Sequence, residues 1–143
     1  MQTFSLKKIE RLKREKIIKT LFGGKAPSVA AYPIRAVFTL DATLYTGEGV
    51  PCQVAFSVPK KNFKRAHDRN RYKRLMREAY RLNKTEWYAF LKTNNLKCAL
   101  MLLFTAKDEQ DFATLNTKMQ KLIAKLCEQI KTDLKTRDSE WIA

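Results

Sequence analysis

Residues 60–81 read KKNFKRAHDRNRYKRLMREAYR, and most of this stretch has the pattern of an amphipathic helix. At 3.6 residues per turn its apolar side chains share one stripe. The stripe consists of Tyr72, Leu75, Met76, Ala79 and Leu82. The opposite side carries Arg69, Asn70, Lys73, Arg74, Arg77 and Arg81. One face can therefore pack on a core, while the other presents guanidinium groups, whose planar forks match the oxygens of phosphates.

We expect this helix to begin near Asp68, because Phe63 leaves the apolar stripe when the helix is extended back to it. Residues 62–67 then form a basic loop or irregular turn. Asp68 is expected to cap the helix and to complement its dipole. The single histidine, His67, lies among arginines, and this setting favours an RNA contact or a turn residue over a general base.

The segments before this helix predict a short helix and two strands. Residues 14–22 have helical spacing and end at Gly23-Gly24, a typical helix stop. Residues 32–40 and 52–58 alternate between apolar and polar side chains as strands do. The glycines of residues 46–51 predict a hairpin loop between these two strands.

The segments after it predict a buried strand and a long helix. Residues 96–105 form a near-continuous apolar run, which is typical of a strand buried on both faces. Residues 112–130 have the spacing of an amphipathic helix, and the tail after Leu134 is expected to fray. The order predicts a two-layer α+β sandwich in which the basic helix crosses over between two strands of one sheet. The default hand of such a crossover is right-handed.

Composition narrows the class of partner. The chain has 143 residues, with 29 Lys and Arg against 14 Asp and Glu, and a formal net charge of +15. That length suits one domain with its own core. The charge indicates a polyanion, with nucleic acid as the first candidate and an anionic membrane surface as the second. A merely soluble basic protein is disfavoured, because the charge gathers on one helix face.

The cysteines and the start of the chain indicate a cytoplasmic protein. Cys52, Cys98 and Cys127 are odd in number and form no C-x-x-C pair, so we expect reduced, mostly buried thiols. The first residues, MQTFSLKK, lack the apolar region of a signal peptide. The longest apolar run, residues 98–104, is too short to span a bilayer.

No catalytic constellation is visible. Asp108, Glu109 and Asp111 precede the last helix, where capping is a more natural role than metal binding. Phe22 and Phe38 can stack single-stranded bases if they are exposed, and core packing is an equal alternative for them. No metal-ligand set, nucleophile elbow or phosphate-binding glycine loop is present.

The pattern Arg69-Asn70-Arg71-x-Lys73-Arg74-x-x-Arg77-Glu78 resembles the RNR signature of the bacterial ribonuclease P protein family. Flanking segments are similar to the family as well, and the resemblance covers most of the chain. They are Arg11-Leu12-Lys13, Leu21-Phe22 with the glycines after it, Phe56–Lys61, Asn62–Asp68 and Leu100–Lys107. The RNR segment is the specific part.

The resemblance implies a fold and a function. The fold is an α-β sandwich of order α-β-β-β-α-β-α with a left-handed βαβ crossover, similar to domain IV of elongation factor G. Residues 1–134 are expected to form this single domain, followed by a frayed tail over residues 135–143. The family's protein is an accessory subunit that binds the catalytic RNA of ribonuclease P and the 5′ leader of precursor tRNA. The RNA, with Mg²⁺ held by RNA and substrate rather than by a protein site, hydrolyses the phosphodiester that joins leader to tRNA. Neither a membrane nor a protein partner is implied.

Matching the motif residue by residue gives the expected sites. The positions expected to bind RNA are Lys60, Lys61, Lys64, Arg65, Arg69, Asn70, Arg71, Lys73, Arg74 and Arg77. The positions expected to line the leader cleft, between the first helix and the sheet, are Ile18, Phe22 and Phe38. Ile18 stands where the family often has an aromatic residue, so an apolar wall replaces one stacking platform there.

Two other classes remain open from the residues. A non-enzymatic RNA-binding protein of ribosomal or assembly type suits the charge and fold class equally well. An autonomous nuclease requires a cluster of carboxylates or histidines, which the sequence does not display.

Overall fold

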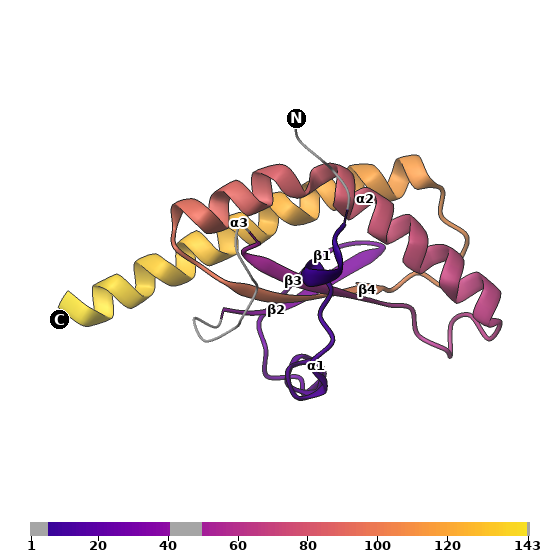
Figure 1. The fold of residues 1–143 in the computed structure, drawn as a ribbon, viewed down its shortest axis with the longest axis horizontal. Coiled ribbons are helices and arrows are strands. Elements are labelled where there is room, and N and C mark those ends of the chain that lie inside the picture. The colour runs from indigo at the N-terminus through magenta and orange to yellow at the C-terminus, as the bar shows by residue number, and fades with distance from the viewer. Residues whose placement is uncertain (1–5, 41–49, 143) are drawn as a thin grey trace.

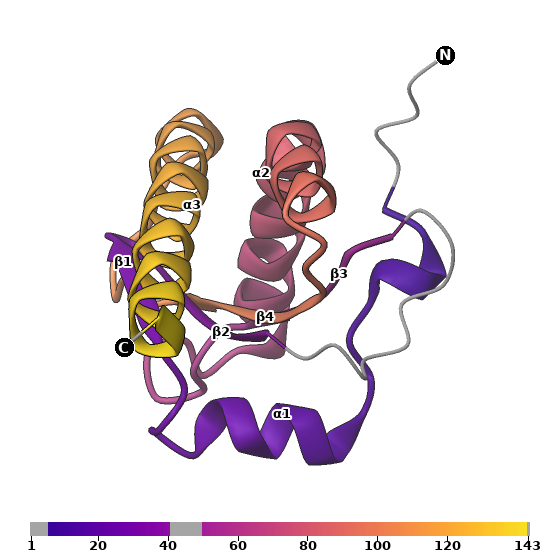
Figure 2. The same ribbon diagram turned by 90° about the vertical axis from the view of Figure 1, so that its left-hand side faces the viewer.

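The computed structural model describes residues 6–142 except residues 41–49, with side-chain surroundings through Lys135. A four-stranded sheet carries two long helices on one face and one short helix on the other (Figures 1 and 2). The elements are η1 (Lys8–Glu10), α1 (Glu15–Phe22), β1 (Ser28–Ala31), β2 (Ile34–Leu40), β3 (Cys52–Ser57), α2 (Ala66–Thr93), β4 (Cys98–Phe104) and α3 (Phe112–Ile142). This is the α-β-β-β-α-β-α order that the family resemblance implied, with three strands before the long basic helix.

The sheet has the order β1-β2-β4-β3, with β4 between β2 and β3. β2 runs antiparallel to both β1 and β4, and β3 runs parallel to β4, with Val54 beside Leu100. The predicted hairpin between β2 and β3 is therefore wrong; its loop falls largely on residues 41–49, outside the described residues. β4 takes the central place because its side chains are apolar toward both faces, as a doubly covered strand requires.

The structure contains a strand, β1, that the sequence prediction missed. β1 ends at Ala31, and Tyr32-Pro33 forms the turn into β2. The sequence prediction placed residues 32–40 in one strand and overlooked β1. Residues 28–31, SVAA, are too short for a clear alternation to be seen.

The crossover from β3 through α2 to β4 is left-handed (Figure 2). In that view β3 lies to the right of β4, α2 lies above them, and both strands run away from the viewer. The chain thus turns anticlockwise as it advances. The default expectation of a right-handed crossover is wrong, and the hand implied by the family resemblance is correct.

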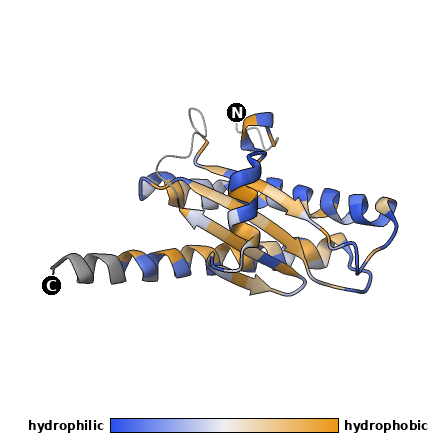
Figure 3. Ribbon diagram, turned by 90° about the horizontal axis from the view of Figure 1, so that it is seen from below, coloured by the Kyte–Doolittle hydropathy of each residue, from blue (hydrophilic) through white to orange (hydrophobic). Residues whose placement is uncertain are grey.

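Alternation along the strands separates two apolar layers. Phe38, Leu100 and Phe104 face α2 and α3 in the main core. Val37 and Met101 face the other side, where they pack with Leu12 and with Leu21 of α1 in a smaller cluster. Figure 3 shows hydrophobic strands on the side that α1 crosses, with a largely hydrophilic α1 lying over them. α1 therefore covers only part of an apolar sheet face.

α2 is one continuous helix whose start differs slightly from the prediction. It begins at Ala66, and its N-cap residue, Arg65, makes no side-chain capping bond. Asp68 lies in the first turn, where its charge complements the helix dipole, but it is not the cap. Asn94-Asn95 ends the helix, with Asn95 at a φ of 57°.

The prediction of the apolar stripe of α2 is correct for its first residues and wrong for its last one. Tyr72, Met76 and Ala79 are buried, and Leu75 packs against the core from a half-buried position. Leu82 is 42% exposed, because the buried stripe continues through Tyr80 instead and on to Trp87 and Leu91.

Replacing Met76 by alanine should cost about 2–5 kcal/mol of unfolding free energy, because Met76 is 0% exposed and its loss opens a cavity. Leu82→Ala is the matched control on the same helix, and its cost should stay within about 0.5 kcal/mol. Urea denaturation of both variants measures the difference. Equal losses would show that the buried face of α2 is misplaced.

α3 packs beside α2 over the sheet (Figure 2), and its start is capped as predicted. The backbone N–H of Thr114 donates to Asp111 Oδ1 at 2.7 Å, and this bond lowers the pKa of Asp111. The helix extends to Ile142, so the backbone after Leu134 is helical where the sequence predicted fraying.

The three cysteines are free, with Cys52 and Cys98 buried and Cys127 half-buried, as expected. Burial raises the pKa of Cys127. Among the helices described, none is long and apolar enough to cross a bilayer.

Candidate RNA-binding surface

The first half of α2 presents a set of basic side chains to solvent. Asn70, Arg71 and Arg74 are exposed, and Lys73 and Arg77 are half-buried. Within the described part of the chain, no carboxylate lies in ion-pair contact with any of these four cations. Their charge is therefore available to an external anion.

Two of these arginines lie over aromatic rings. The guanidinium carbon of Arg71 is 5.6 Å from the ring centroid of Tyr72, and that of Arg77 is 5.6 Å from the centroid of Phe56. Such contacts hold a guanidinium group in place by cation–π attraction. The ring occupies a face of the fork, so its N–H edge can still donate to phosphate oxygens.

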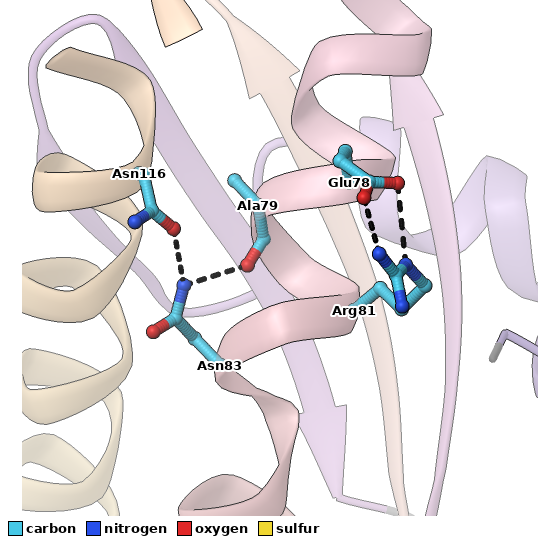
Figure 4. Close-up of polar contacts among 5 residues, drawn as sticks. All are labelled: Glu78, Ala79, Arg81, Asn83 and Asn116. Carbon is cyan, nitrogen blue, oxygen red and sulfur yellow. Dashed lines mark hydrogen bonds and ion pairs between the residues drawn. The ribbon is translucent and has the colours of Figure 1, made fainter. Parts of the chain in front are cut away.

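At the next turn of α2, Arg81 is paired with a carboxylate and Asn83 with neighbouring polar groups (Figure 4). Arg81 donates to the carboxylate of Glu78, which lowers the pKa of Glu78 and raises that of Arg81. Asn83 Nδ2 donates to Ala79 O and to Asn116 Oδ1 of α3, both at 2.7 Å. The sequence placed Arg81 with the other basic residues, but a carboxylate on its own helix already partners it.

The segment before α2 is an ordered turn rather than a loose loop. The N–H groups of Asn62 and Phe63 both donate to Pro59 O, at 3.2 and 3.3 Å. The Phe63 ring packs 4.9 Å from the Tyr72 ring and 5.8 Å from the Phe104 ring, measured between centroids. We call residues 60–65 the basic turn. Its exposed cations are Lys60, Lys61, Lys64 and Arg65.

Arg69 differs from its neighbours in the RNR pattern. Its Nη1 donates to Phe63 O and to Lys64 O, each at 2.8 Å, and its side chain is half-buried. The sequence prediction placed Arg69 on the RNA-facing side with the other basic residues. In the structure its guanidinium group is held against the backbone of the basic turn.

The three residues expected in the leader cleft do not lie together. Phe22 is 55% exposed at the end of α1, and Ile18 is half-buried against the sheet face below α1. Phe38 is 1% exposed in the main core beneath α2 and α3, so its assignment to the cleft is wrong. Alternation decides this: Phe38 shares a face with Ile34 and Ala36, and that face meets the long helices.

Two features escaped the sequence prediction. Arg35 is exposed on β2 and alternates with the main-core residues, so it shares the α1 side of the sheet; its Nη2 donates to Ser28 Oγ at 3.0 Å. A basic residue at an outward strand position was the available signal. The second is a buried pair, Glu10 with Lys84 of α2, whose Oε1 and Nζ atoms are 2.6 Å apart. Nothing local in the sequence marks a contact between such distant residues.

Among the described residues, no group of three or more His, Cys, Asp or Glu side chains is placed to hold a metal ion.

Comparison with known proteins identifies the family of this chain. The family model named Ribonuclease P matches residues 6–127, a span that includes η1, the sheet, α2 and the first half of α3. The chain belongs to the ribonuclease P protein family. It is 38% identical over 125 residues to the ribonuclease P protein component of Porphyromonas gingivalis, covering 87% of this chain and 88% of that one. The component of Chlorobium phaeobacteroides is 29% identical over 126 residues, covering 83% and 86% of the two chains.

Solved structures of ribonuclease P proteins share the fold. The Staphylococcus aureus protein superposes with a TM-score of 0.60 at 19% identity, over 80% of this chain and 93% of that one. The Thermotoga maritima protein gives 0.58 at 21% identity, over 80% and 94%. At these identities the similarity supports the architecture, including the placement of α2 against the sheet.

Proposed function

We propose that this protein binds the catalytic RNA of ribonuclease P through the first half of α2 and the basic turn. The observation that carries the proposal is the set of cations on Arg71, Lys73, Arg74 and Arg77, none paired with a carboxylate among the described residues. Cations on such a helix face can neutralise backbone phosphates, and the affinity of that binding falls as salt rises.

We infer a second contact, to the 5′ leader of precursor tRNA, on the sheet face that α1 partly covers. Phe22 offers an exposed ring there for base stacking, Ile18 an apolar wall, and Arg35 a cation for a phosphate. The proposed leader site therefore includes Arg35, which the sequence prediction lacked, and excludes Phe38. The α2 face and the sheet face below α1 are distinct, so the two RNAs can be held at once.

The mechanism we propose is electrostatic and positional. Two polyanions repel each other, and a protein with net charge +15 lowers that repulsion where they meet. The phosphodiester hydrolysis resides in the RNA subunit, with Mg²⁺ bound by RNA and substrate. The protein contributes binding and orientation of the leader, which raises the effective concentration of substrate at the RNA's own site.

Adding the protein to its cognate catalytic RNA should lower the Mg²⁺ concentration needed for cleavage of precursor tRNA. It should also tighten binding of precursor relative to mature tRNA, because only the precursor carries a leader. Cleavage rates across a Mg²⁺ titration, with and without protein, measure the first quantity, and equilibrium binding of both tRNAs measures the second.

The control is a precursor shortened to a minimal leader, for which the protein's effect on affinity should largely disappear. A protein that binds RNA but changes neither quantity would instead fit a ribosomal or assembly-type role. Cleavage by protein rigorously freed of RNA would place the chemistry in the protein and contradict the proposal.

A further inference from the structure

Arg69 contacts the basic turn from within the protein. Its Nη1 atom donates to two consecutive carbonyl oxygens, those of Phe63 and Lys64, each at 2.8 Å. Hydrogen bonds from a charged donor are about twice as strong as neutral ones. They lock together the end of the turn and the first turn of α2, since Arg69 is itself in the helix.

The basic turn carries clustered positive charge, so contacts that hold its backbone in place are needed. Lys60, Lys61, Lys64 and Arg65 place four like charges on six residues, and they repel one another in the free protein. On the apolar side the turn is held by Phe63, which packs on Tyr72 and Phe104. On the polar side it is held by the bonds to Pro59 O and by Arg69.

We propose that Arg69 is a positioning residue for RNA binding, which acts by holding the basic turn in a preformed shape rather than by gripping a phosphate. This inference rests on the proposed function and divides the RNR triplet by role. Arg71 faces solvent and is available to RNA, while the Nη1 of Arg69 is engaged by the protein's own backbone. A preformed turn binds more tightly, because its ordering does not have to accompany binding.

The first experiment uses the free protein and no RNA. Amide hydrogen exchange over residues 60–65 should accelerate by at least about tenfold in Arg69→Ala, because the turn loses two charge-assisted hydrogen bonds. Arg74→Ala is the matched control: it removes an exposed arginine of the same helix and should leave exchange of the turn unchanged. Exchange that is equally slow in both variants would overturn the proposal.

The second experiment measures the salt dependence of binding to the cognate catalytic RNA. Arg74→Ala should reduce the slope of log K against log salt by roughly 0.7–0.9, the share of one phosphate contact. Arg69→Ala should reduce it by more than one share, because the cations of the basic turn lose their placement together. A purely stabilising role for Arg69 would leave the slope of the folded protein unchanged.

A third variant tests whether Arg69 acts through the turn. In a background with Lys60→Gln, Lys61→Gln, Lys64→Gln and Arg65→Gln, adding Arg69→Ala should change affinity by less than about twofold, because the groups it positions are already neutral. Full additivity would make Arg69 an independent RNA contact. Failure of the wild-type protein to bind the catalytic RNA would count against the proposed function instead, and the exchange experiment still decides the role of Arg69.

Discussion

Replacing Glu10 by alanine is expected to destabilise the protein by about 3–5 kcal/mol, the usual cost of removing one partner from a buried ion pair. Glu10 is 2% exposed. Its Oε1 accepts hydrogen bonds from Lys84 Nζ and Tyr88 OH, both at 2.6 Å, and its Oε2 accepts from the backbone N–H of Lys7 at 2.5 Å. The substitution leaves the buried ammonium group of Lys84 without this carboxylate.

Glu10 also anchors the N-terminal segment to the rest of the fold. The segment lies along β3, with Leu12 N donating to Val54 O at 2.9 Å and Gln53 Nε2 donating to Ile9 O at 3.0 Å. We therefore expect Glu10→Ala to increase hydrogen exchange of this segment, in addition to lowering the unfolding free energy in urea.

The double variant Glu10→Leu with Lys84→Met is the control for charge burial. Because it removes both charges and keeps apolar volume, it should be markedly more stable than Glu10→Ala. If the double variant is the less stable of the two, the buried charge of Lys84 is not what makes the single substitution costly.

The same carboxylate predicts a dependence on pH. Burial alone raises the pKa of Glu10, but hydrogen bonds from Lys84, Tyr88 and Lys7 outweigh it and hold the pKa below the ordinary value of 4.5. A lowered folded-state pKa means that the stabilisation is present above about pH 4.5 and is lost as the pH falls further. The difference in unfolding free energy between wild type and Glu10→Gln should thus shrink in acid.

Neutralising Arg71, Lys73 and Arg74 together to alanine is expected to weaken binding to the catalytic RNA by roughly a hundredfold near 0.15 M salt. Three phosphate contacts contribute roughly two to three to the slope of log K against log salt, and the variant should lose that share. The fold should survive, because Arg71 and Arg74 are exposed and none of the three is paired with a carboxylate among the described residues. Filter binding or fluorescence anisotropy across a salt series measures both quantities.

The matched control removes three cations elsewhere. Lys92, Lys97 and Lys121 are exposed; Lys92 lies in the last turn of α2, at the end remote from Arg71, and Lys97 lies between α2 and β4. Replacing them by alanine lowers the net charge equally but should change the slope little. Equal effects of the two triple variants would mean that total charge, not the α2 face, governs binding.

Whether a feature could be predicted from the sequence depends on the sequence range of the interaction that forms it. The apolar and basic faces of α2, the cap at Asp111 and the burial of β4 are local or periodic features, and each was predicted. Periodicity also placed Ile34, Ala36 and Phe38 on one face of a strand. It could not say which face meets the long helices, and so it left Phe38 open between core and cleft, where the family resemblance misplaced it.

Most element types, the separation of charge from apolar surface on α2 and, through the RNR pattern, the family all follow from the amino-acid sequence. Tertiary structure alone decided three other things: that β4 separates β2 from β3, that Glu10 meets Lys84 across 74 residues of sequence, and that Arg69 turns inward to the carbonyls of Phe63 and Lys64. The physical reason is common to all three. Periodicity records which side of an element is apolar, whereas partner choice depends on the competition among all surfaces that can reach one another once the chain is compact.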